Sequence, residues 1–335
     1  MKVILPLAGL GRRMRPHTWS KPKPLLNVAG KPVLAHVLDK LSPLEIEEVI
    51  FIIGWLGDQI KEYVSANYDF AARYIVQEEL KGQAHAIYLA KEHLDGPCLI
   101  IFVDTLFEAN ITNLEERPED VLLYVQEVKD PRRFGVVVEK EGRVVQLIEK
   151  PSGFEHRKAI VGVYYIREGK ELVKAIEYLL EHDIRTKGEY YLTDALQVMI
   201  ERGAFVGTEP VSVWEDCGKP ETVLHTNRYL LEHGHAHSRE LEGSTIIPPV
   251  YIAETAKVES SIIGPYATVC EGVHLKGAIV RDTIIEEDSR IENALLEHSL
   301  IGRRVTIRGF SGQLNVGDDC TIELNEENRS KEPRE

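Results

Sequence analysis

The sequence has no long apolar run, few cysteines and fewer basic than acidic residues, and each of these shortages excludes a class of protein. No apolar stretch approaches the roughly 18–20 residues of a membrane-spanning helix, so no membrane partner is expected. The four cysteines (Cys98, Cys217, Cys270 and Cys320) form no CxxC pair, a pattern typical of reduced thiols in a cytoplasmic protein. With 40 Lys and Arg against 54 Asp and Glu, the formal net charge is −14, which argues against nucleic acid as a ligand.

Both common glycine-rich phosphate motifs are missing as well. The strand-like start MKVILP leads into residues 7–32, LAGLGRRMRPHTWSKPKPLLNVAGKP, which contain neither GxxxxGK[ST] nor the third glycine of GxGxxG. A strand followed by a glycine loop also differs from a cleavable signal peptide. What the stretch does contain is six Arg and Lys residues between positions 12 and 31, and no acidic residue. Local positive charge in an acidic protein predicts a small anionic ligand.

Three features of this stretch favour a ligand with more than one phosphate. Gly9 and Gly11 would allow the backbone to approach a phosphate closely and to point N–H groups at it. An arginine just after them could bind phosphate oxygens through its planar fork. Two prolines flank Lys23 and restrict its backbone, so that this cation would be presented with little conformational freedom.

The texture of the chain predicts an α/β domain over residues 1–232. Short β-rich runs such as VILPLAG and PCLIIFV alternate with segments such as KELVKAIEYLLEHD, which carry apolar residues at helical spacing. This alternation predicts a mostly parallel sheet with helices on both faces, and ligands at the carboxyl ends of its strands. The polar segment HGHAHSRELEGS, residues 233–244, is predicted to be a solvated linker rather than a metal site.

The C-terminal part has a different repeat. Branched aliphatic residues recur at intervals of five or six from Ile252 to Ile307. A helix would need intervals of three and four, and a hairpin sheet strict alternation, so the spacing predicts a parallel β-helix over residues 245–323. The run is long enough for about three to four turns. We expect the β-helix to serve packing and homo-oligomerisation, and the charged tail, residues 324–335, to be disordered.

Several segments resemble one known family. GLGRRMRPHTWSKPKPLLNVAGKP resembles the signature GxGTRLxPxTxxxPKxLLxVxxKP of the sugar-1-phosphate nucleotidylyltransferases. Further segments match along nearly the whole chain: QEELKGQAHAI, VDTLF, FGVVV, IEKP, VGVYYI, GEYYLTDA and WEDCGKPETVLHTNRYLL. With its appended β-helix, the chain is similar to the long form of glucose-1-phosphate thymidylyltransferase. The resemblance implies a Rossmann-like, mostly parallel sheet followed by a short left-handed β-helix of hexapeptide-like repeats.

The resemblance also implies a reaction. An oxygen of a sugar-1-phosphate, with glucose-1-phosphate favoured, would attack the α-phosphorus of a nucleoside triphosphate, with dTTP favoured, and expel pyrophosphate. Such a transfer depends on positioning and on charge neutralisation by Mg²⁺ and fixed cations, and it requires no protein nucleophile.

Individual residues of this chain match the functional positions of the family. The implied catalytic set is Arg13, Lys23, Asp104, Lys150 and Asp216; the nucleotide would contact Leu7, Ala8, Gly9, Gly11, Arg13, Gln77 and Gly82; the sugar phosphate would contact Gly135, Glu149, Lys150, Gly162 and Tyr164. Asp104 and Asp216 would hold Mg²⁺, for which one or two protein carboxylates with substrate oxygens are sufficient. Arg13 would bind the leaving pyrophosphate, and Lys23 the α-phosphate and the sugar phosphate. Gln77 would read the edge of the base, and Glu149 would accept hydrogen bonds from sugar hydroxyls.

At four positions the sequence departs from the family pattern. Val103 replaces the glycine before the metal aspartate, Arg12 a threonine, Cys217 a threonine of the closing motif, and Tyr191 a common Glu or Gln. The charged set is intact, so these departures concern which substrates are used.

Three alternatives to the favoured reaction remain. One is a UTP-dependent uridylyltransferase for glucose- or N-acetylglucosamine-1-phosphate, because thymine and uracil differ by one methyl group, which offers only about 1–3 kcal/mol of discrimination. Another is a regulatory paralogue with weak catalysis. The third, an acyltransferase in the β-helix, is disfavoured because His274 and His298 are isolated and no catalytic histidine loop is evident.

Overall fold

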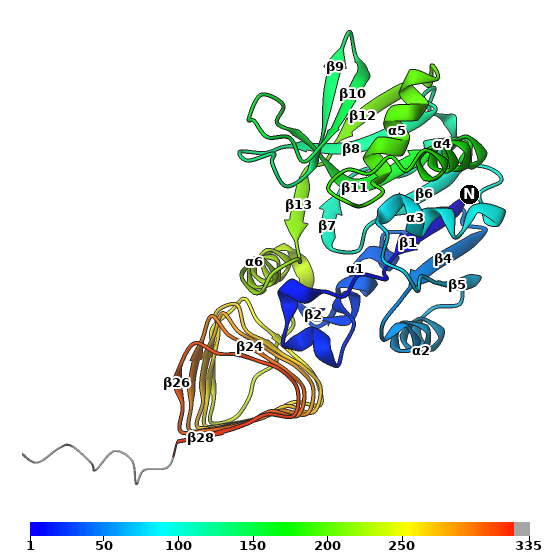
Figure 1. Ribbon diagram of the computed structural model, residues 1–335. Coiled ribbons are helices and arrows are strands. Elements are labelled where there is room, and N and C mark those ends of the chain that lie inside the picture. Colours follow the sequence, from blue (N-terminus) through cyan, green and yellow to red (C-terminus); the bar gives the residue numbers. More distant parts are fainter. Residues whose placement is uncertain (325–335) are drawn as a thin grey trace, which may run out of the picture. The chain divides into compact units, whose positions relative to one another are not determined.

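The computed structural model describes residues 1–324 (Figure 1). The chain divides into two compact units, and neither is one continuous stretch. The sheet unit consists of Met1–Leu10 and Val37–Trp214, and the β-helix unit of Gly11–His36 and the residues from Glu215 onward. The basic residues of the N-terminal stretch therefore belong to the same unit as the C-terminal repeats. The predicted domains, residues 1–232 and 245–323, are continuous stretches and stay a prediction. The predicted tail lies outside the described residues except for Leu324.

A nine-stranded sheet forms the centre of the sheet unit. Seven strands follow the order β10-β9-β11-β6-β1-β4-β5, while β8 pairs with β11 and β12 pairs with β8. The strands are β1 (Lys2–Pro6), β4 (Glu48–Ile53), β5 (Ala72–Val76), β6 (Cys98–Ile101), β8 (Val121–Glu127), β9 (Gly135–Lys140), β10 (Arg143–Glu149), β11 (Lys158–Ile166) and β12 (Val206–Pro210). β1 lies parallel to β4 and β6, and β4 parallel to β5, whereas β11 is antiparallel to β6, β8 and β9. The α/β class is confirmed, and the sheet is mixed.

The antiparallel half has a local cause that the sequence prediction did not use. Glu141 and Gly142 join β9 to β10, with φ angles of 53° and 77°. Two residues with positive φ form a tight hairpin turn, and so short a connection can only join antiparallel neighbours. The run FGVVVEKEGRVVQLIEK is therefore two paired strands.

The helices of the chain fall where apolar residues recur at helical spacing, with two more beyond them. They are α1 (Val33–Asp39), α2 (Gly57–Asn67), α3 (Gln83–Tyr88), α4 (Gly169–Glu181), α5 (Leu192–Glu201) and α6 (Pro220–Leu230). In the sheet unit, α3, α4 and α5 pack their apolar residues with β1, β4, β6 and β8 in one core. Burying such a side chain contributes about 1.5–3 kcal/mol, so this core fixes the strands whose ends carry the predicted site.

The repeats of the β-helix unit form a parallel β-helix, as predicted, and Figure 1 shows its three sheets as the sides of a triangular coil. The first sheet has β14 (Thr245–Ile246), β17 (Ile262–Ile263), β20 (Ile279–Arg281), β23 (Leu295–Glu297) and β26 (Ser311–Gly312). The second has β15 (Tyr251–Ile252), β18 (Thr268–Val269), β21 (Ile284–Ile285), β24 (Leu300–Ile301) and β27 (Asn315–Val316). The third has β16 (Lys257–Glu259), β19 (His274–Lys276), β22 (Arg290–Glu292), β25 (Thr306–Arg308) and β28 (Thr321–Glu323).

Each sheet has five strands within the described residues, so the β-helix makes five turns where three to four were predicted. Inside, one aliphatic residue stacks on the next: Ile263 pairs with Val280 and Val280 with Leu296, all fully buried. The predicted repeat ran from Ile252 to Ile307, so the turns at both ends were not counted. The first sheet begins one turn earlier, at Ile246, and ends on Gly312 in place of an aliphatic residue.

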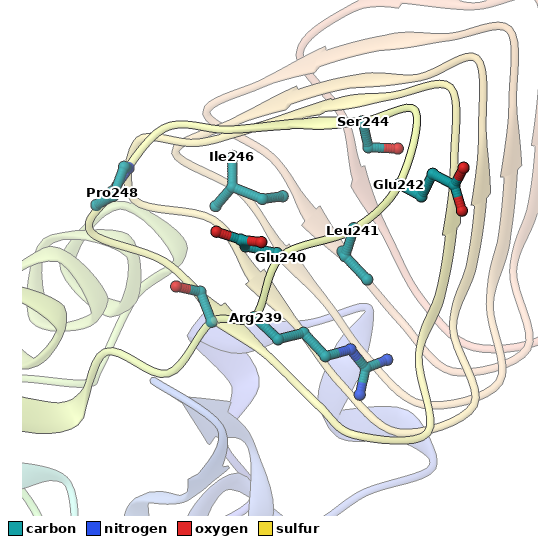
Figure 2. Close-up of a pocket in the computed structure, with 8 residues that line it drawn as sticks. Arg239, Glu240, Leu241, Glu242, Ser244, Ile246 and Pro248 are labelled. Atoms are coloured by element: carbon teal, nitrogen blue, oxygen red, sulfur yellow. The ribbon is translucent and has the colours of Figure 1, made fainter.

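The predicted linker, residues 233–244, is attached to the first turn of the β-helix instead of being fully solvated. Arg239 donates to the carbonyl oxygens of Glu254 (2.7 Å) and Ala256 (2.9 Å), and Leu241 packs against the apolar core together with Ile246. These residues line an open cavity of about 820 Å³ at residues 238–248 (Figure 2). The cavity contains none of the predicted site residues. The cavity forms where the segment of residues 238–248 crosses the end of the coil (Figure 2).

Short elements complete the described chain. They are the paired strands β2 (Asn27–Val28) and β3 (Lys31–Pro32), and the strands β7 (Thr105–Glu108) and β13 (Val213–Asp216). The 3₁₀ turns are η1 (Arg12–Met14), η2 (His17–Trp19), η3 (Lys23–Leu25), η4 (Lys91–His93) and η5 (Leu114–Glu116), and η6 (Leu231–His235) is a π-helical turn that reaches into the predicted linker. Among the described residues no helix is long and apolar enough to cross a membrane.

Candidate active site

In the sheet unit, the predicted nucleotide residues follow the carboxyl ends of neighbouring parallel strands. The backbone N–H of Leu7 donates to Ile52 (2.7 Å), and that of Gln77 to Ile53 (2.8 Å). Gly9 is exposed, and a side chain placed there would meet no atom within 4 Å. Gly54 packs against Ala8, since a Cβ at Gly54 would lie 2.8 Å from the Ala8 carbonyl oxygen. The first turn of the N-terminal stretch is thus held at the ligand-binding edge of the sheet.

Gln77 and Gly82 lie together on this edge. The side-chain amide of Gln77, which is 5% exposed, lies 3.3 Å from Nδ1 of His85 and 3.5 Å from the Gly82 carbonyl oxygen. Gly82 has a φ of 114°, and a Cβ there would lie 2.5 Å from the carbonyl oxygen of Tyr190. Only glycine fits this close approach. Burial lowers the pKa of His85, so at neutral pH a neutral imidazole accompanies the amide.

Asp104 follows β6 and stands beside the middle of β11. Its neighbour Phe102 donates its backbone N–H to Gly162 (2.9 Å), and Thr105 donates its hydroxyl to the Val161 carbonyl oxygen (3.2 Å). Gly162 has a φ of 89°, and a Cβ there would lie 3.2 Å from the Cβ of Phe102. The Asp104 segment is therefore fixed on both sides by β11.

Val103 and Tyr164 define the surroundings of Asp104. Val103, in place of the family glycine, is 3% exposed and is therefore part of the buried core. Tyr164 is buried, and its pKa is raised by burial and by the carboxylates of Glu149 and Asp104. The phenol stays neutral and lies within the electrostatic reach of both carboxylates.

Glu149, at the end of β10, forms a compact polar group with the start of α5. The Thr193 hydroxyl donates to Oε2 of Glu149 (2.8 Å). A Cβ at Gly135 would lie 2.9 Å from both of these oxygens, so the glycine makes room for them. Burial raises the pKa of Glu149, partly offset by the Thr193 hydrogen bond. A buried carboxylate with a fixed orientation is suited to accept hydrogen bonds from hydroxyl groups.

Lys150 lies next to Glu149 and points at an aromatic ring. Its Nζ contacts the Tyr191 hydroxyl, lies 4.2 Å from the centre of the Tyr191 ring and is 3.9 Å from Oε1 of Glu149. The Lys150 backbone has a φ of 49°, and its N–H donates to Phe134 (2.9 Å). The ammonium is thus held near the buried carboxylate. Tyr191, where Glu or Gln was expected, gives Lys150 a neutral partner.

In the β-helix unit, the basic loop is folded tightly around Gly11. This residue has a φ of 59°; a Cβ there would lie 2.9 Å from Thr18 Cγ2 and 3.2 Å from the Cβ of Lys23. The Thr18 hydroxyl donates to the Gly11 carbonyl oxygen (2.9 Å). Gly11 is therefore needed for the close packing of Lys23 against the start of the loop.

The same unit brings Arg13 and Asp216 together at Gly218. The Gly218 N–H donates to Oδ1 of Asp216 (2.7 Å). A Cβ at Gly218 would lie 2.6 Å from that oxygen and 2.8 Å from Nη2 of Arg13. Cys217, which replaces a family threonine, is 1% exposed and contacts Thr226 Oγ1 at 3.7 Å, so it packs beneath the site. A guanidinium and a carboxylate flank one buried glycine, an arrangement suited to a phosphate with its metal ion.

The predicted site residues divide between the units. The sheet unit carries Leu7, Ala8, Gly9, Gln77, Gly82, Asp104, Gly135, Glu149, Lys150, Gly162 and Tyr164, and the β-helix unit carries Gly11, Arg13, Lys23 and Asp216. No cluster of three or more His, Cys, Asp or Glu suited to a metal occurs among residues 1–324. Asp104 and Asp216 belong to different units, and each is a carboxylate of the kind that a hard cation such as Mg²⁺ takes together with substrate and water oxygens. That the two hold one Mg²⁺ stays a prediction.

Four residues contact or make room for the predicted site residues but were not predicted from the sequence to do so. They are His85, Thr193, Gly218 and, as a partner of Lys150, Tyr191. Thr193 and Tyr191 precede or begin a helix, where a side chain faces the strand ends, and Gly218 follows a candidate metal aspartate by two positions; these were the available signals. His274 and His298, expected to be isolated, face Glu259 (3.2 Å) and Asp282 respectively.

Comparisons with known proteins identify relatives over nearly the whole chain. Residues 2–233 match the family model described as "Nucleotidyl transferase". The chain is 31% identical over 347 residues to the bifunctional protein GlmU of Methanococcus vannielii, with 97% of this chain and 80% of that protein covered. It is 32% identical to the low-salt glycan biosynthesis nucleotidyltransferase Agl11 of Haloferax volcanii, with 97% and 100% covered. It is 29% identical to the glucose-1-phosphate thymidylyltransferase of Streptomyces antibioticus, with 97% and 99% covered.

Two solved structures share the fold of the sheet part. A UDP-glucose pyrophosphorylase complexed with UDP-glucose superposes with a TM-score of 0.61 at 20% identity, covering 69% of this chain and 98% of that one. A putative glucose-1-phosphate thymidylyltransferase from Bacillus anthracis gives a TM-score of 0.61 at 25% identity, covering 72% and 98%. These likenesses identify the Rossmann-like fold, while the match over nearly the full length of the relatives includes the β-helix.

Proposed function

Because the chain belongs to the nucleotidyl transferase family, we propose that it joins dTTP and glucose-1-phosphate, giving the nucleotide sugar and pyrophosphate. An oxygen of the sugar phosphate forms a bond to the α-phosphorus as the bond from that phosphorus to the bridging oxygen of pyrophosphate breaks. The observation that carries this proposal is the convergence of Arg13 and Asp216 on Gly218. A fork-shaped cation beside a carboxylate fits a triphosphate that loses pyrophosphate.

The cations of the site have distinct tasks in this reaction. Arg13 binds the departing pyrophosphate, and Lys23, packed against Gly11, neutralises the α-phosphate. Mg²⁺, held by Asp104 and Asp216, would supply charge neutralisation of the triphosphate oxygens. Because each charged side chain is already in position before negative charge moves onto the leaving pyrophosphate, little reorganisation accompanies the transfer.

The acceptor is bound by the buried carboxylate group of the sheet unit. Glu149, oriented by Thr193 (2.8 Å), accepts hydrogen bonds from sugar hydroxyls, and Gly135 and Gly162 leave room for the ring. Lys150 binds the sugar phosphate from its place against Tyr191. No protein nucleophile takes part, since the attacking oxygen belongs to the substrate.

A second candidate is the same transfer with UTP, onto glucose- or N-acetylglucosamine-1-phosphate. The similarity to a GlmU protein and the shared fold with a UDP-glucose pyrophosphorylase favour it. Gln77 can pair with either pyrimidine, because thymine and uracil present the same polar edge and differ by a methyl group. Discrimination of about 1–3 kcal/mol leaves use of both nucleotides open to measurement.

A substrate matrix tests both candidates. The purified chain is incubated with Mg²⁺, with each of dTTP, UTP, ATP and GTP against glucose-, galactose- and N-acetylglucosamine-1-phosphate, and pyrophosphate release is followed. We expect the highest kcat/KM for dTTP with glucose-1-phosphate. The variant Asp216→Asn serves as the control for contaminating activity. A preference for UTP would select the second candidate, and no turnover with any pair would select a regulatory paralogue.

Homo-oligomerisation through the β-helix stays a prediction that light scattering of the purified chain can test. The acyltransferase reading of the β-helix stays disfavoured, and acetyl transfer from acetyl-CoA to a sugar phosphate would reinstate it.

A further inference from the structure

A buried cluster of charges joins the basic loop to the β-helix inside the β-helix unit. Lys21 Nζ donates to Glu286 Oε2 (2.6 Å) and to Glu287 Oε1 (3.1 Å). Asn27 donates its backbone N–H to Glu286 Oε1 (3.0 Å) and its amide to Glu286 Oε2 (2.7 Å). Lys21, Asn27 and Glu286 are 7%, 5% and 5% exposed. Both oxygens of one β-helix carboxylate are therefore occupied by donors from the loop.

The cluster is costly unless every member is satisfied. Removing a carboxylate from water without a partner costs several kcal/mol, and one lysine here faces two carboxylates. Burial raises the pKa of Glu286, and although burial also acts on Glu287, the attraction of Lys21 lowers the pKa of that carboxyl group. Packing alone would not require such a group, since apolar residues of the same volume are often as stable. The buried charges are better explained by the need to fix the geometry of the loop.

The two anchored residues bracket a catalytic cation. Lys21 and Asn27 lie on either side of η3 (Lys23–Leu25), the turn that carries Lys23. Within this turn Leu25 donates to Pro22 (2.9 Å) and Leu26 to the Lys23 carbonyl oxygen (3.2 Å). A short turn fixed at both ends to one carboxylate has little freedom to shift. The position of Lys23 is thus set by a residue more than 260 positions away in the sequence.

Other contacts place the rest of the loop along the same side of the β-helix. His17 Nε2 lies 2.6 Å from Asn315 Oδ1 of β27, and Ser20 donates to Asp318 (2.8 Å). Asn227 of α6 accepts from the Ala29 N–H (2.8 Å) and from the Thr268 hydroxyl of β18 (2.7 Å). Thr268 on β18, the segment after β21 and Asn315 on β27 belong to three of the five turns of the second sheet. That sheet is the surface on which the loop rests, and Glu286 is at its centre.

We propose that Glu286 is a positioning residue for nucleotidyl transfer, which fixes the loop that presents Lys23 and Arg13 through its hydrogen bonds to Lys21 and Asn27. The role rests on the proposed function, and it deepens it. The β-helix then has a task in the reaction beyond packing: its second sheet is the support of the phosphate-binding loop. Arg13 shares this support, because Gly11 packs against Lys23 (3.2 Å to its Cβ) at the start of the same loop.

The variant Glu286→Gln tests the role with little change of volume. A glutamine has one acceptor oxygen, so it can serve either Lys21 and the Asn27 amide or the Asn27 N–H, and its own N–H groups face the remaining donor. Glu297→Gln is the matched control, since Glu297 lies on β23 of the first sheet and pairs with Arg281 (3.3 Å), and the two side chains are a little less than half exposed. Each variant is measured as the full chain with the best substrate pair of the matrix.

We expect Glu286→Gln to lower kcat about 10-fold, with the KM values changed less than about 3-fold and the midpoint of urea unfolding near pH 7 little changed. Hydrogen exchange of the amides in residues 21–28 should accelerate, while exchange in the β-helix core stays unchanged. Glu297→Gln should match the wild type. A purely structural role would instead lower the unfolding free energy and leave kcat per folded molecule unchanged.

Two results overturn the proposal in distinguishable ways. An active wild type with an unaffected Glu286→Gln, in kcat and in exchange, overturns the positioning role alone. A wild type inactive with every substrate pair overturns the proposed transfer and this role with it.

Discussion

The two units place their charged site residues by different means. In the sheet unit Glu149 and Lys150 end a strand, and partners from the start of α5 and from β9 fix them. In the β-helix unit Lys23 and Arg13 lie on a loop of short 3₁₀ turns that rests on a sheet formed by residues far along the chain. A strand end positions a side chain by register, whereas a loop needs anchors at both sides. The buried cluster around Glu286 is that anchor.

This difference has an energetic consequence. The ion pairs of the sheet unit near the surface are open to water, as between Lys158 and Glu139 (2.5 Å), whose side chains are 42% and 28% exposed. The pair of Lys21 and Glu286 (2.6 Å) has side chains 9% and 6% exposed. An ion pair of similar length therefore contributes little to the free energy of unfolding in the sheet unit, whereas breaking the buried pair in the β-helix unit lowers it strongly.

The largest expected effect comes from breaking the buried cluster. Lys21→Met leaves Glu286 and Glu287 without their cation, and we expect the unfolding free energy to fall by about 3–5 kcal/mol, because breaking a buried pair leaves uncompensated charge. Lys158→Met in the sheet unit should cost no more than about 1 kcal/mol. Urea titrations followed by circular dichroism measure both. Equal losses for the two variants would remove the contrast between the units.

A second comparison separates catalysis from stability. Asp216→Asn should lower kcat/KM about 100- to 1000-fold, because a carboxylate beside Arg13 and Gly218 is lost at the point where phosphate charge develops. The neighbouring Glu215→Gln should retain nearly full activity, since Glu215 pairs with His225 (2.7 Å) away from Gly218. Both carboxylates are partly exposed, so the unfolding free energies should stay close to the wild type. A comparable loss of activity in the two variants would contradict the assignment of Asp216.

A smaller effect is expected on the sugar side of the sheet unit. Thr193→Val removes the hydrogen bond that orients Glu149 (2.8 Å). We expect KM for the sugar phosphate to rise about 3- to 10-fold, with KM for the nucleotide unchanged, because one hydrogen bond is worth about 0.5–1.5 kcal/mol. Thr208→Val is the control, since Thr208 donates to Glu139 outside the site. If the KM for the nucleotide rises instead, the assignment of Thr193 to the sugar-phosphate side is wrong.

Much of the fold could be predicted because its signals are local. Apolar spacing gave the helices α1, α2 and α4 within a few residues, and a period near six gave the β-helix. The hairpin at Glu141 and Gly142 was missed because the segment EKEGR between the two apolar stretches contains neither of the typical hairpin pairs Asn-Gly and Asp-Gly. The last turn of the β-helix was missed because Gly312 interrupts the aliphatic repeat after Ile307. Ile246 in the first turn fits the repeat but was left out of the predicted run.

The candidate site was predicted as a set of residues from its resemblance to the family. The sequence did not predict which contacts hold the loop that carries Arg13 and Lys23. Lys21 is one of the six basic residues from which a small anionic ligand was predicted, yet its ammonium is bound by Glu286 and Glu287. Nothing local marks those glutamates, since a Glu-Glu pair in an acidic protein is ordinarily a solvated surface. Only tertiary contact between residues so far apart reveals the role.

The last prediction concerns pH and uses the buried cluster itself. Burial raises the pKa of Glu286 to about 7, whereas an unfolded glutamate titrates near its ordinary value. The folded state therefore retains a proton that the unfolded state releases, so the stability linked to this group is fully present below the ordinary pKa and is lost as pH rises through about 7. The groups that face Glu286 keep their charge in this range: Lys21, with a raised pKa, and Glu287, with a lowered one. Cys270 stays neutral, because burial raises its pKa.

The difference in unfolding free energy between the wild type and Glu286→Gln isolates this titration from others, such as that of His17, whose pKa is lowered by burial. Between pH 5.5 and 8 we expect the wild type to lose about 1–2 kcal/mol relative to the variant. Glu297→Gln, at an exposed pair, should show no such trend. A variant that is the more stable protein at pH 8 and yet the slower enzyme would separate the two properties: the carboxylate is retained at a cost in stability because the loop must be held for catalysis. If the difference in unfolding free energy does not change between pH 5.5 and 8, Glu286 titrates outside this range and the prediction is wrong.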